Sequence, residues 1–337
     1  MDILKQQTRI DFLGLRQRAF GASAVLLLVA VVSLAVRGLS FGIDFTGGTL
    51  VELRYGDSVQ IEHVREVLAD AGIADATVQY FGTSRDIMVR LPVDAETSSA
   101  DLSGRITEAL RRDVPETLTD SLAGDAQQCI SSGDAAPRDC HVQMLRVEFV
   151  GPQVGDELAE QGGLAMIYAL IGILIYVAWR FEWRFAVASV VALVHDVVFT
   201  LGFFALFQLE FSLPVLAAFL AVIGYSLNDT IVVFDRIREN FRKMRRGDTI
   251  EIMNISINQT LSRTLLTSGT TLVVVLALLL VGGEVIRGFA TALFIGIVVG
   301  TYSSIYVASP VALLLGTKRE DLLVAKKEGA EQPDVTP

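Results

Sequence analysis

The chain has little of what most metal sites and nucleophilic enzymes need. It has only two cysteines, Cys129 and Cys140, and three histidines, which are scattered at His63, His141 and His195. Such scattering leaves no cluster with the spacing of metal ligands, so we expect no metal site. His141 adjoins Cys140, but two neighbours in a loop are weak evidence for a catalytic dyad.

Signatures of ATP-driven and hydrolytic enzymes are also absent. There is no Walker motif, no HExxH and no G-x-S-x-G. The glycine-rich stretch FGIDFTGGTLVEL (41–53) lacks the Lys-Ser/Thr pair of a P-loop, which favours a tight junction between a span and a strand over a phosphate site. We therefore expect a protein that is not an enzyme, that needs no cofactor and whose work draws on an ion gradient.

Basic charge is scarce as well. There are 28 Lys and Arg against 38 Asp and Glu, a net charge of −10, which argues against nucleic-acid binding. Hydrophobic residues, in contrast, make up 52% of the chain, and its mean hydropathy is +0.50. This composition indicates an integral membrane protein with one sizeable soluble insert.

Six apolar runs are long enough to cross a bilayer as helices. They cover roughly 19–37, 159–179, 184–206, 212–235, 263–282 and 288–315. The first run has four positive residues before it, like a signal peptide, but it is long and has no convincing cleavage site. We interpret it as an uncleaved anchor, transmembrane helix 1 at 19–38, with helices 2–6 in 159–315.

Lys and Arg predict how these spans are oriented. They are concentrated in the N-terminus (1–18), the turn 179–184, the basic loop 236–262 and the tail 316–337. By the positive-inside rule these segments are cytoplasmic, which places residues 39–158 outside the cell's inner membrane. Both termini are then cytoplasmic.

The outer region 39–158 alternates strand-like and helix-like segments. The order is β-α-β-β-α-β, the pattern of a ferredoxin-like α+β domain; the strands are expected at 49–55, 76–82, 86–91 and 144–150, and the helices at 61–72 and 99–113. A polar insert, 114–143, precedes the last strand and contains both cysteines. Outside the cytoplasm Cys129 and Cys140 can form a small-loop disulfide, the alternative being two free thiols in a mobile loop.

Ionisable side chains inside spans are costly, which makes them candidates for function. Asn228 and Asp229 lie near the cytoplasmic end of the fourth span, and Arg263 begins the fifth at a compatible depth. Two interpretations stay open for the trio Asn228, Asp229 and Arg263. One is a buried Asp229–Arg263 ion pair, supported by Asn228, that fixes helix packing; the other is a carboxylate that gains and loses a proton as its pairing with Arg263 changes. His195 and Asp196, in the third span, are weaker candidates for the same chemistry, since either could be a packing contact.

Four stretches of the sequence carry a family resemblance. They are FGIDFTGGTLVEL (41–53), VEFVGPQVGDEL (147–158), GYSLNDTIVVFDRIRENFR (224–242) and NQTLSRTLLTSGTT (258–271). With them, in order over about 10–318, the chain resembles the SecF family, the smaller subunits of the SecD–SecF accessory complex of bacterial Sec protein export. The resemblance implies the resistance–nodulation–division superfamily, with six spans and a ferredoxin-like outer domain.

The resemblance also implies a function. SecD–SecF uses the proton gradient to help pull preproteins from the SecYEG channel, and the family's membrane Asp and Arg fall on Asp229 and Arg263. The implied partners are SecD, SecYEG, the translocating preprotein and membrane lipids, with YajC as a further candidate. Two alternatives remain: a proton-coupled exporter of small molecules or lipids in the same superfamily, and a translocon assembly subunit that transports nothing.

Overall fold

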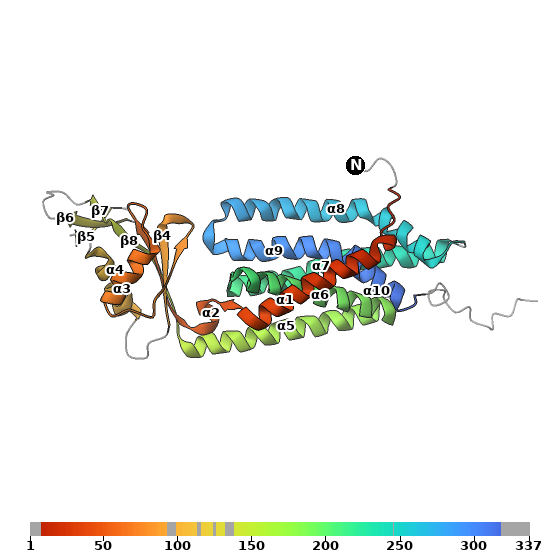
Figure 1. Ribbon diagram of the computed structural model, residues 1–337, viewed down its shortest axis with the longest axis horizontal. Coiled ribbons are helices and arrows are strands. Elements are labelled where there is room, and N and C mark those ends of the chain that lie inside the picture. Colours follow the sequence, from red (N-terminus) through yellow and green to blue (C-terminus); the bar gives the residue numbers. More distant parts are fainter. Residues whose placement is uncertain are drawn as a thin grey trace, which may run out of the picture.

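The computed structural model describes residues 8–92, 99–112, 116–123, 126–131, 138–244 and 246–317. It has two parts, a bundle of long helices and a smaller domain of strands and short helices at one end of it (Figure 1). The N-terminal end of helix α1 and the short helix α10 lie at the other end of the bundle. Most of the predicted tail at 316–337, from residue 318 on, and parts of the insert at 114–143 lie outside the described residues.

Within the described residues, six helices are long and apolar enough to span a membrane, which confirms the predicted number of spans. They are α1 (Arg16–Arg37), α5 (Pro152–Arg180), α6 (Trp183–Phe207), α7 (Leu213–Lys243), α8 (Thr249–Val281) and α9 (Gly283–Ser303), the last continued by the π-helical turn η2 (Ser304–Ala308) and α10 (Ser309–Leu314). Helices α7 and α8 extend well into the segment 236–262, which is therefore largely helical. Asp248 ends this connection by accepting a hydrogen bond from the first amide of α8.

Helix α7 lies at the centre of the bundle, and α9 packs closely against it. A Cβ at Gly296 would come within 2.3 Å of Val222, and one at Gly300 within 3.1 Å of Ser226. These two glycines form a GxxxG pattern, in which missing side chains let two helix backbones approach. The close packing fixes the face of α9 that meets α7.

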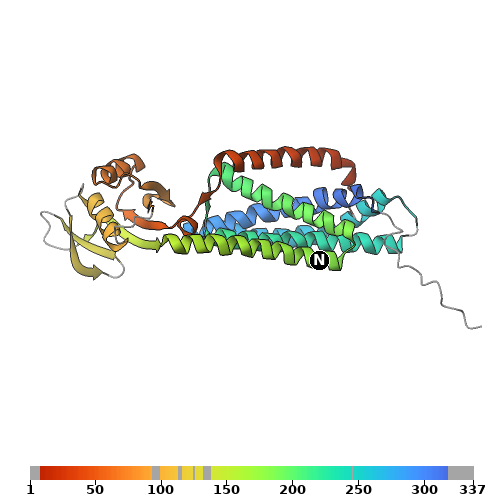
Figure 2. The same ribbon diagram turned by 90° about the horizontal axis from the view of Figure 1, so that it is seen from below.

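Helix α1 runs along the outside of the bundle and contacts α6 (Figure 2). At its N-terminal end two asparagines one turn apart on α8 hold the preceding segment. Asn258 accepts a hydrogen bond from the Ile10 amide (2.9 Å) and donates to the Ile10 carbonyl (2.8 Å), and Asn254 accepts from the Leu13 amide (3.0 Å). The segment before α1 is thus bound to a helix more than 200 residues later.

The smaller domain contains a four-stranded antiparallel sheet in the order β3-β4-β2-β8. Its elements follow one another as β2 (Gly48–Tyr55), α3 (Ile61–Asp70), β3 (Thr77–Phe81), β4 (Thr83–Leu91), α4 (Ser99–Arg111) and β8 (Val142–Val150). Alternate residues of the central strands, such as Val51 and Val89, pack with Val64 of α3 and Ile106 of α4 in one apolar core. Both helices therefore cover the same face of the sheet.

The opposite face of this sheet meets the helix bundle through a small junction. Strand β1 (Ser40–Phe41) pairs in parallel with β9 (Glu210–Phe211), which connects α6 to α7, and the single turn α2 (Ile43–Thr46) follows β1. Gly47 and Gly48, at φ +67° and +133°, adopt backbone conformations that favour glycine as the chain turns into β2. The glycine-rich stretch thus forms a tight junction between span and strand.

Candidate functional site

The candidate site lies where α6, α7, α8 and α9 meet inside the bundle. Asp229 of α7 is only 2% exposed, and its Oδ2 accepts a hydrogen bond from the Ser268 hydroxyl of α8 (3.2 Å). The Ser268 oxygen in turn accepts a hydrogen bond from the Thr301 hydroxyl of α9 (2.7 Å). The buried carboxylate is therefore joined through two hydroxyls to a third helix.

Arg263 takes a different place from the one expected. Its side chain lies on an exposed face of α8, and among the described residues no direct ion pair joins it to Asp229, although its charge acts on that carboxylate. The reason is the register of the antiparallel pair α7–α8, in which Asn240 bonds Ser256 (2.8 Å) and Asp229 is level with Ser268. Arg263 lies five residues before Ser268, about 7.5 Å along the axis and turned onto another face.

Asn228 does not support Asp229 either. It is exposed on α7, because successive side chains of a helix point about 100° apart and Asp229 occupies the buried face. The predicted trio of Asn228, Asp229 and Arg263 therefore contributes one residue to the interior of this bundle and two to its surface.

Asp196 of α6 is the second buried carboxylate and has the larger set of partners. It has no exposed surface, and its Oδ2 accepts hydrogen bonds from Ser226 of α7 (2.5 Å) and Ser303 of α9 (2.7 Å). Its Oδ1 lies 2.9 Å from Nδ1 of His195, which is 5% exposed. The structure thus brings the two predicted residues into direct contact, although they are sequence neighbours on a helix.

Helix α9 connects the two carboxylates. Thr301 faces the Ser268–Asp229 side and Ser303 faces Asp196, two residues apart in the last turn before the π-helical turn η2. Each hydroxyl also lies near a carbonyl of its own helix, Thr301 at 2.7 Å from Ile297 O and Ser303 at 3.2 Å from Gly300 O. Since a hydroxyl carries one proton, each can donate to only one of its two neighbours at a time.

Sequence reasoning missed Ser226, Ser268, Thr301 and Ser303 as the partners of the carboxylates. Serine and threonine are frequent in these helices, and many donate to the carbonyl one turn earlier, as Ser189 does to Phe185 O (2.9 Å). Only the relative rotation of the helices distinguishes a hydroxyl that faces a carboxylate from one that does not. The GxxxG of α9 was the available signal, because it sets that rotation.

The junction links this site to the smaller domain. Asp44 of α2 accepts a hydrogen bond from the Leu213 amide, the first of α7 (2.8 Å). Arg90 of β4 bonds the Glu210 carboxylate (2.5 Å) and the Phe41 carbonyl (3.0 Å). Burial raises the pKa of Glu210, and the Arg90 charge only partly opposes this. The helix that carries Asp229 therefore starts in direct contact with the smaller domain.

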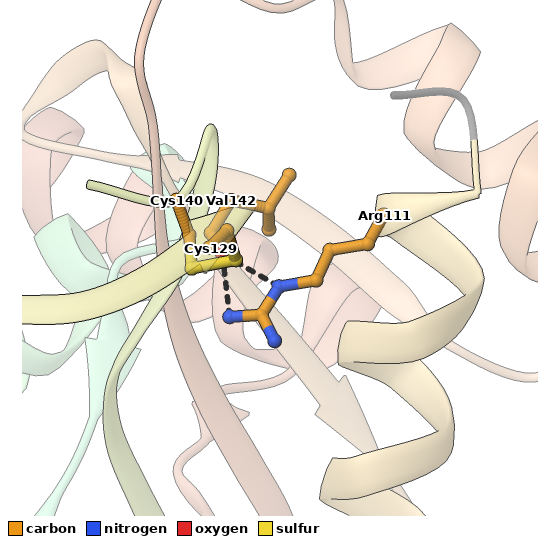
Figure 3. Close-up of a disulfide and its surroundings, with 4 residues drawn as sticks. All are labelled: Arg111, Cys129, Cys140 and Val142. Carbon is orange, nitrogen blue, oxygen red and sulfur yellow. Dashed lines mark hydrogen bonds between the residues drawn. A yellow bond between two sulfur atoms is a disulfide. The ribbon is translucent and has the colours of Figure 1, made fainter. Parts of the chain in front are cut away.

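In the smaller domain, β5 (Glu116–Ala123), β6 (Ala126–Ser131) and β7 (Arg138–Asp139) form a second small sheet; Cys129 lies in β6, and Cys140 directly follows β7. Cys129 and Cys140 are joined by a disulfide, and the Arg111 guanidinium of α4 donates two hydrogen bonds to the Val142 carbonyl beside it, at 2.9 and 2.8 Å (Figure 3). The bridge thus closes a loop next to the start of β8. Its surroundings are structural and distant from the buried carboxylates.

Comparison with known proteins gives two family matches. Residues 134–318 match the family described as "Protein export membrane protein SecD/SecF, C-terminal", and residues 32–59 match the "SecD/SecF GG Motif". The second range contains the junction glycines, and the first contains both buried carboxylates.

Curated relatives and solved structures agree with these matches. The chain is 49% identical to the protein translocase subunit SecF of Vibrio alginolyticus, over 98% of both chains, and 46% identical to that of Escherichia coli O157:H7, over 97% of this chain and 95% of the relative. It is similar to the crystal structure of SecDF, a translocon-associated membrane protein from Thermus thermophilus, with a TM-score of 0.76 and 38% identity. That likeness covers 94% of this chain but only 39% of the SecDF chain. On this evidence the chain belongs to the SecF branch of the SecD/SecF family of protein-export membrane proteins.

Proposed function

We propose that the chain is a proton-coupled subunit of the Sec translocation machinery, which works with SecD to promote late export and release of preproteins from the SecYEG channel. Family membership supports the Sec assignment and makes the chain a multi-pass inner-membrane protein. The observation that carries the proton coupling is the environment of Asp229. Its carboxylate is buried within an apolar helix, and its hydrogen-bond partner is a neutral hydroxyl, that of Ser268.

The proposed topology has both termini in the cytoplasm and an extracytoplasmic domain of the ferredoxin-like type. The distribution of Lys and Arg in the short loops supports the orientation. The antiparallel sheet order β3-β4-β2-β8, with α3 and α4 on one face, supports the domain type.

SecD is the proposed partner, together with SecYEG, the preprotein, membrane lipids and, as a further candidate, YajC. The size relation supports SecD, because a chain of this length corresponds to about two fifths of the SecDF protein that it resembles. The exposed face of α8 that carries Arg263 is a surface that a partner could cover. A cation on such a face is costly in lipid unless it reaches the headgroups or finds a partner.

The proposed coupling begins with the hydrogen bond between Asp229 and Ser268. An ionised Asp229 can only accept this bond, whereas a protonated one can donate it, which would reverse the direction of the chain Asp229–Ser268–Thr301. One charge that crosses 100 mV supplies about 2.3 kcal/mol, enough to shift a two-state equilibrium by about 50-fold. Protonation would thereby bias how α7 packs against α8 and α9.

Helix α7 is also the proposed path to the outer domain. From Asp229 to Leu213 the helix runs about 24 Å, and its one proline, Pro214, lies in the first turn, where proline does not break a helix. At Leu213 its first amide bonds Asp44, and the preceding Glu210 bonds Arg90 of the sheet. A shift of α7 would therefore act directly on the domain proposed to hold the emerging chain.

The test is late translocation in membrane vesicles, measured with and without an uncoupler. Asp229→Asn should abolish the gradient-dependent part while the protein keeps its normal membrane level. Asp235→Asn is the matched control, because Asp235 is on the same helix but forms an exposed ion pair with Arg180 (2.6 Å); it should retain the activity. Normal gradient dependence in Asp229→Asn would make Asp229 a packing residue. Export that requires the chain but ignores the uncoupler would indicate an assembly subunit.

A further inference from the structure

We propose that His195 and Asp196 form a second proton-accepting site, which helix α9 couples to Asp229. The inference deepens the proposed function. Its coupling part rests on the proton role of Asp229, whereas the second site itself does not. It starts from the partners of Asp196, a carboxylate without exposed surface that contacts an imidazole and two hydroxyls from three helices. No cation neutralises this carboxylate among the described residues, which distinguishes it from a structural ion pair.

The geometry determines how the pair holds its protons. An ionised Asp196 can only accept hydrogen bonds, so the His195 Nδ1 that lies 2.9 Å from Oδ1 must carry a hydrogen. We assign the resting pair a neutral His195, with a free lone pair on Nε2, beside an ionised Asp196. The pair as a whole then carries one negative charge, in a place where a charge is expensive.

Uptake of one proton removes that charge. Hydronium supplies the proton and leaves as water, an N–H bond forms at Nε2 of His195, the N–H bond at Nδ1 breaks, and an O–H bond forms at Oδ1 of Asp196. The imidazole is the slightly exposed member of the pair and Asp196 the fully buried one, so the relay runs from the accessible group to the enclosed one. Release to water reverses each step.

The neutral pair changes the hydrogen bond to α9. Oδ2 of Asp196 becomes the carbonyl oxygen of an uncharged acid, a weaker acceptor than a carboxylate. Ser303 then has the Gly300 carbonyl, at 3.2 Å, as its competing acceptor. Ser226 of α7 contacts the same Oδ2 and lies one turn before Asp229, so both α7 and α9 respond to the charge on Asp196.

The coupling to Asp229 follows from the symmetry of these contacts. Thr301 faces Ser268 and Asp229 and has the Ile297 carbonyl as its second acceptor, as Ser303 has that of Gly300. Both hydroxyls precede the π-helical turn η2, where the regular bonding of the helix changes, a feature that often marks functional sites. A change at either carboxylate therefore acts on the same turn of α9.

The other ionisable groups around the pair are few. Tyr302 of α9 lies 6.4 Å from the His195 ring, stacks on Tyr306 and has its hydroxyl bonded to Ser23 of α1 (3.1 Å). Between Leu213 and Phe234 of α7 and between Ile252 and Val281 of α8, the charged groups are those of Asp229 and Arg263; the other charged residues of these helices lie beyond these stretches. These groups have to be held constant in any titration of the pair.

The experiment is infrared difference spectroscopy of the full chain in lipid nanodiscs, titrated with pH, with the C=O stretch of protonated carboxyl groups as the readout. Wild type should show separate bands from Asp196 and Asp229, and Asp196→Asn and Asp229→Asn should each remove one. Ser303→Ala should shift the Asp196 band, because that group loses a donor. Ser189→Ala, which removes a buried hydroxyl that bonds only a carbonyl, should leave it unchanged.

Coupling is measured as the change in the Asp196 midpoint when Asp229 is replaced by Asn. This change should be lost with Thr301→Val, which removes the hydroxyl at nearly constant shape. If Asp196→Asn does not fold, His195→Gln provides the same test by displacing the Asp196 midpoint. An identical set of bands in wild type and Asp196→Asn would overturn the second site. A wild-type spectrum that shows the Asp196 band but no band from Asp229 would instead contradict the proposed function.

Discussion

Gly202 of α6 offers the sharpest test of how α1 is held against the bundle. A Cβ at this position would lie 2.1 Å from Ala30 Cβ and 2.4 Å from Ala30 Cα. Non-bonded carbons pack at about 3.5–4.0 Å, so in Gly202→Ala helix α1 must withdraw by about 1.5 Å. No flexible side chain can move aside, because the contact involves the backbone of α1.

The magnitude follows from two opposing effects. Overpacking of this kind costs about 1–3 kcal/mol, and alanine gains about 1 kcal/mol over glycine in a helix interior. We therefore expect Gly202→Ala to destabilise the chain by about 1–2 kcal/mol. Withdrawal of α1 would also stretch the Ser23–Tyr302 hydrogen bond, which lies beside His195.

The assay is unfolding of the full chain in detergent micelles. Gly224→Ala is the matched control, because a Cβ there meets nothing within 4 Å, and it should be neutral or stabilising. Ala30→Gly should relieve Gly202→Ala only in part, because it removes the methyl contact at 2.1 Å and leaves the backbone contact at 2.4 Å. Equal effects of the two glycine substitutions would refute this packing.

Two further predictions concern the smaller domain and its junction with the helix bundle. Cys129→Ser should lower the free energy of unfolding by up to about 3 kcal/mol, the chain-entropy value for a loop of 11 residues. Cys140→Ser should give the same loss, measured by thermal unfolding of the oxidised protein. A loss in only one of the two variants would contradict a bridge between them. Burial raises the pKa of Glu210 more than the Arg90 charge lowers it. The stability that this shift gives the folded protein is therefore present below the ordinary pKa of 4.5 and is lost as the pH rises through the raised pKa. Glu210→Gln should flatten this fall in a pH series of unfolding midpoints, and an unchanged slope would show that Glu210 is ordinarily solvated.

The architecture was largely predictable because two strong patterns decide it. Apolar runs long enough to cross a bilayer indicated the six spans, and the alternation of apolar residues in stretches such as 49–55 and 86–91 indicated the strands of the main sheet. The longer strands of the insert, β5 and β6, were not predicted, because their sequences, ETLTDSLA and AQQCIS, are largely polar.

Of the candidate site, only the residues that are energetically costly to bury in an apolar helix could be predicted. Asp229 and Asp196 stood out because carboxylates are rare in apolar helices. The expected contact between Asp229 and Arg263 depended on the register of two helices, and a shift of about one and a half turns replaced Arg263 by Ser268. A sequence gives the order of residues along a helix, but the packing of its neighbours decides which of them face one another.

The anchoring of α1 has a consequence for the order in which the chain is made. At its C-terminal end α1 leads into β1, whose pairing partner β9 comes only at Glu210–Phe211, and Asn254 and Asn258 hold the segment before its N-terminal end. During synthesis these two contacts can therefore form only after the third and then the fifth span have been made. The base of the smaller domain closes after its main sheet is complete, and the segment before α1, although translated early, is fixed only once α8 exists.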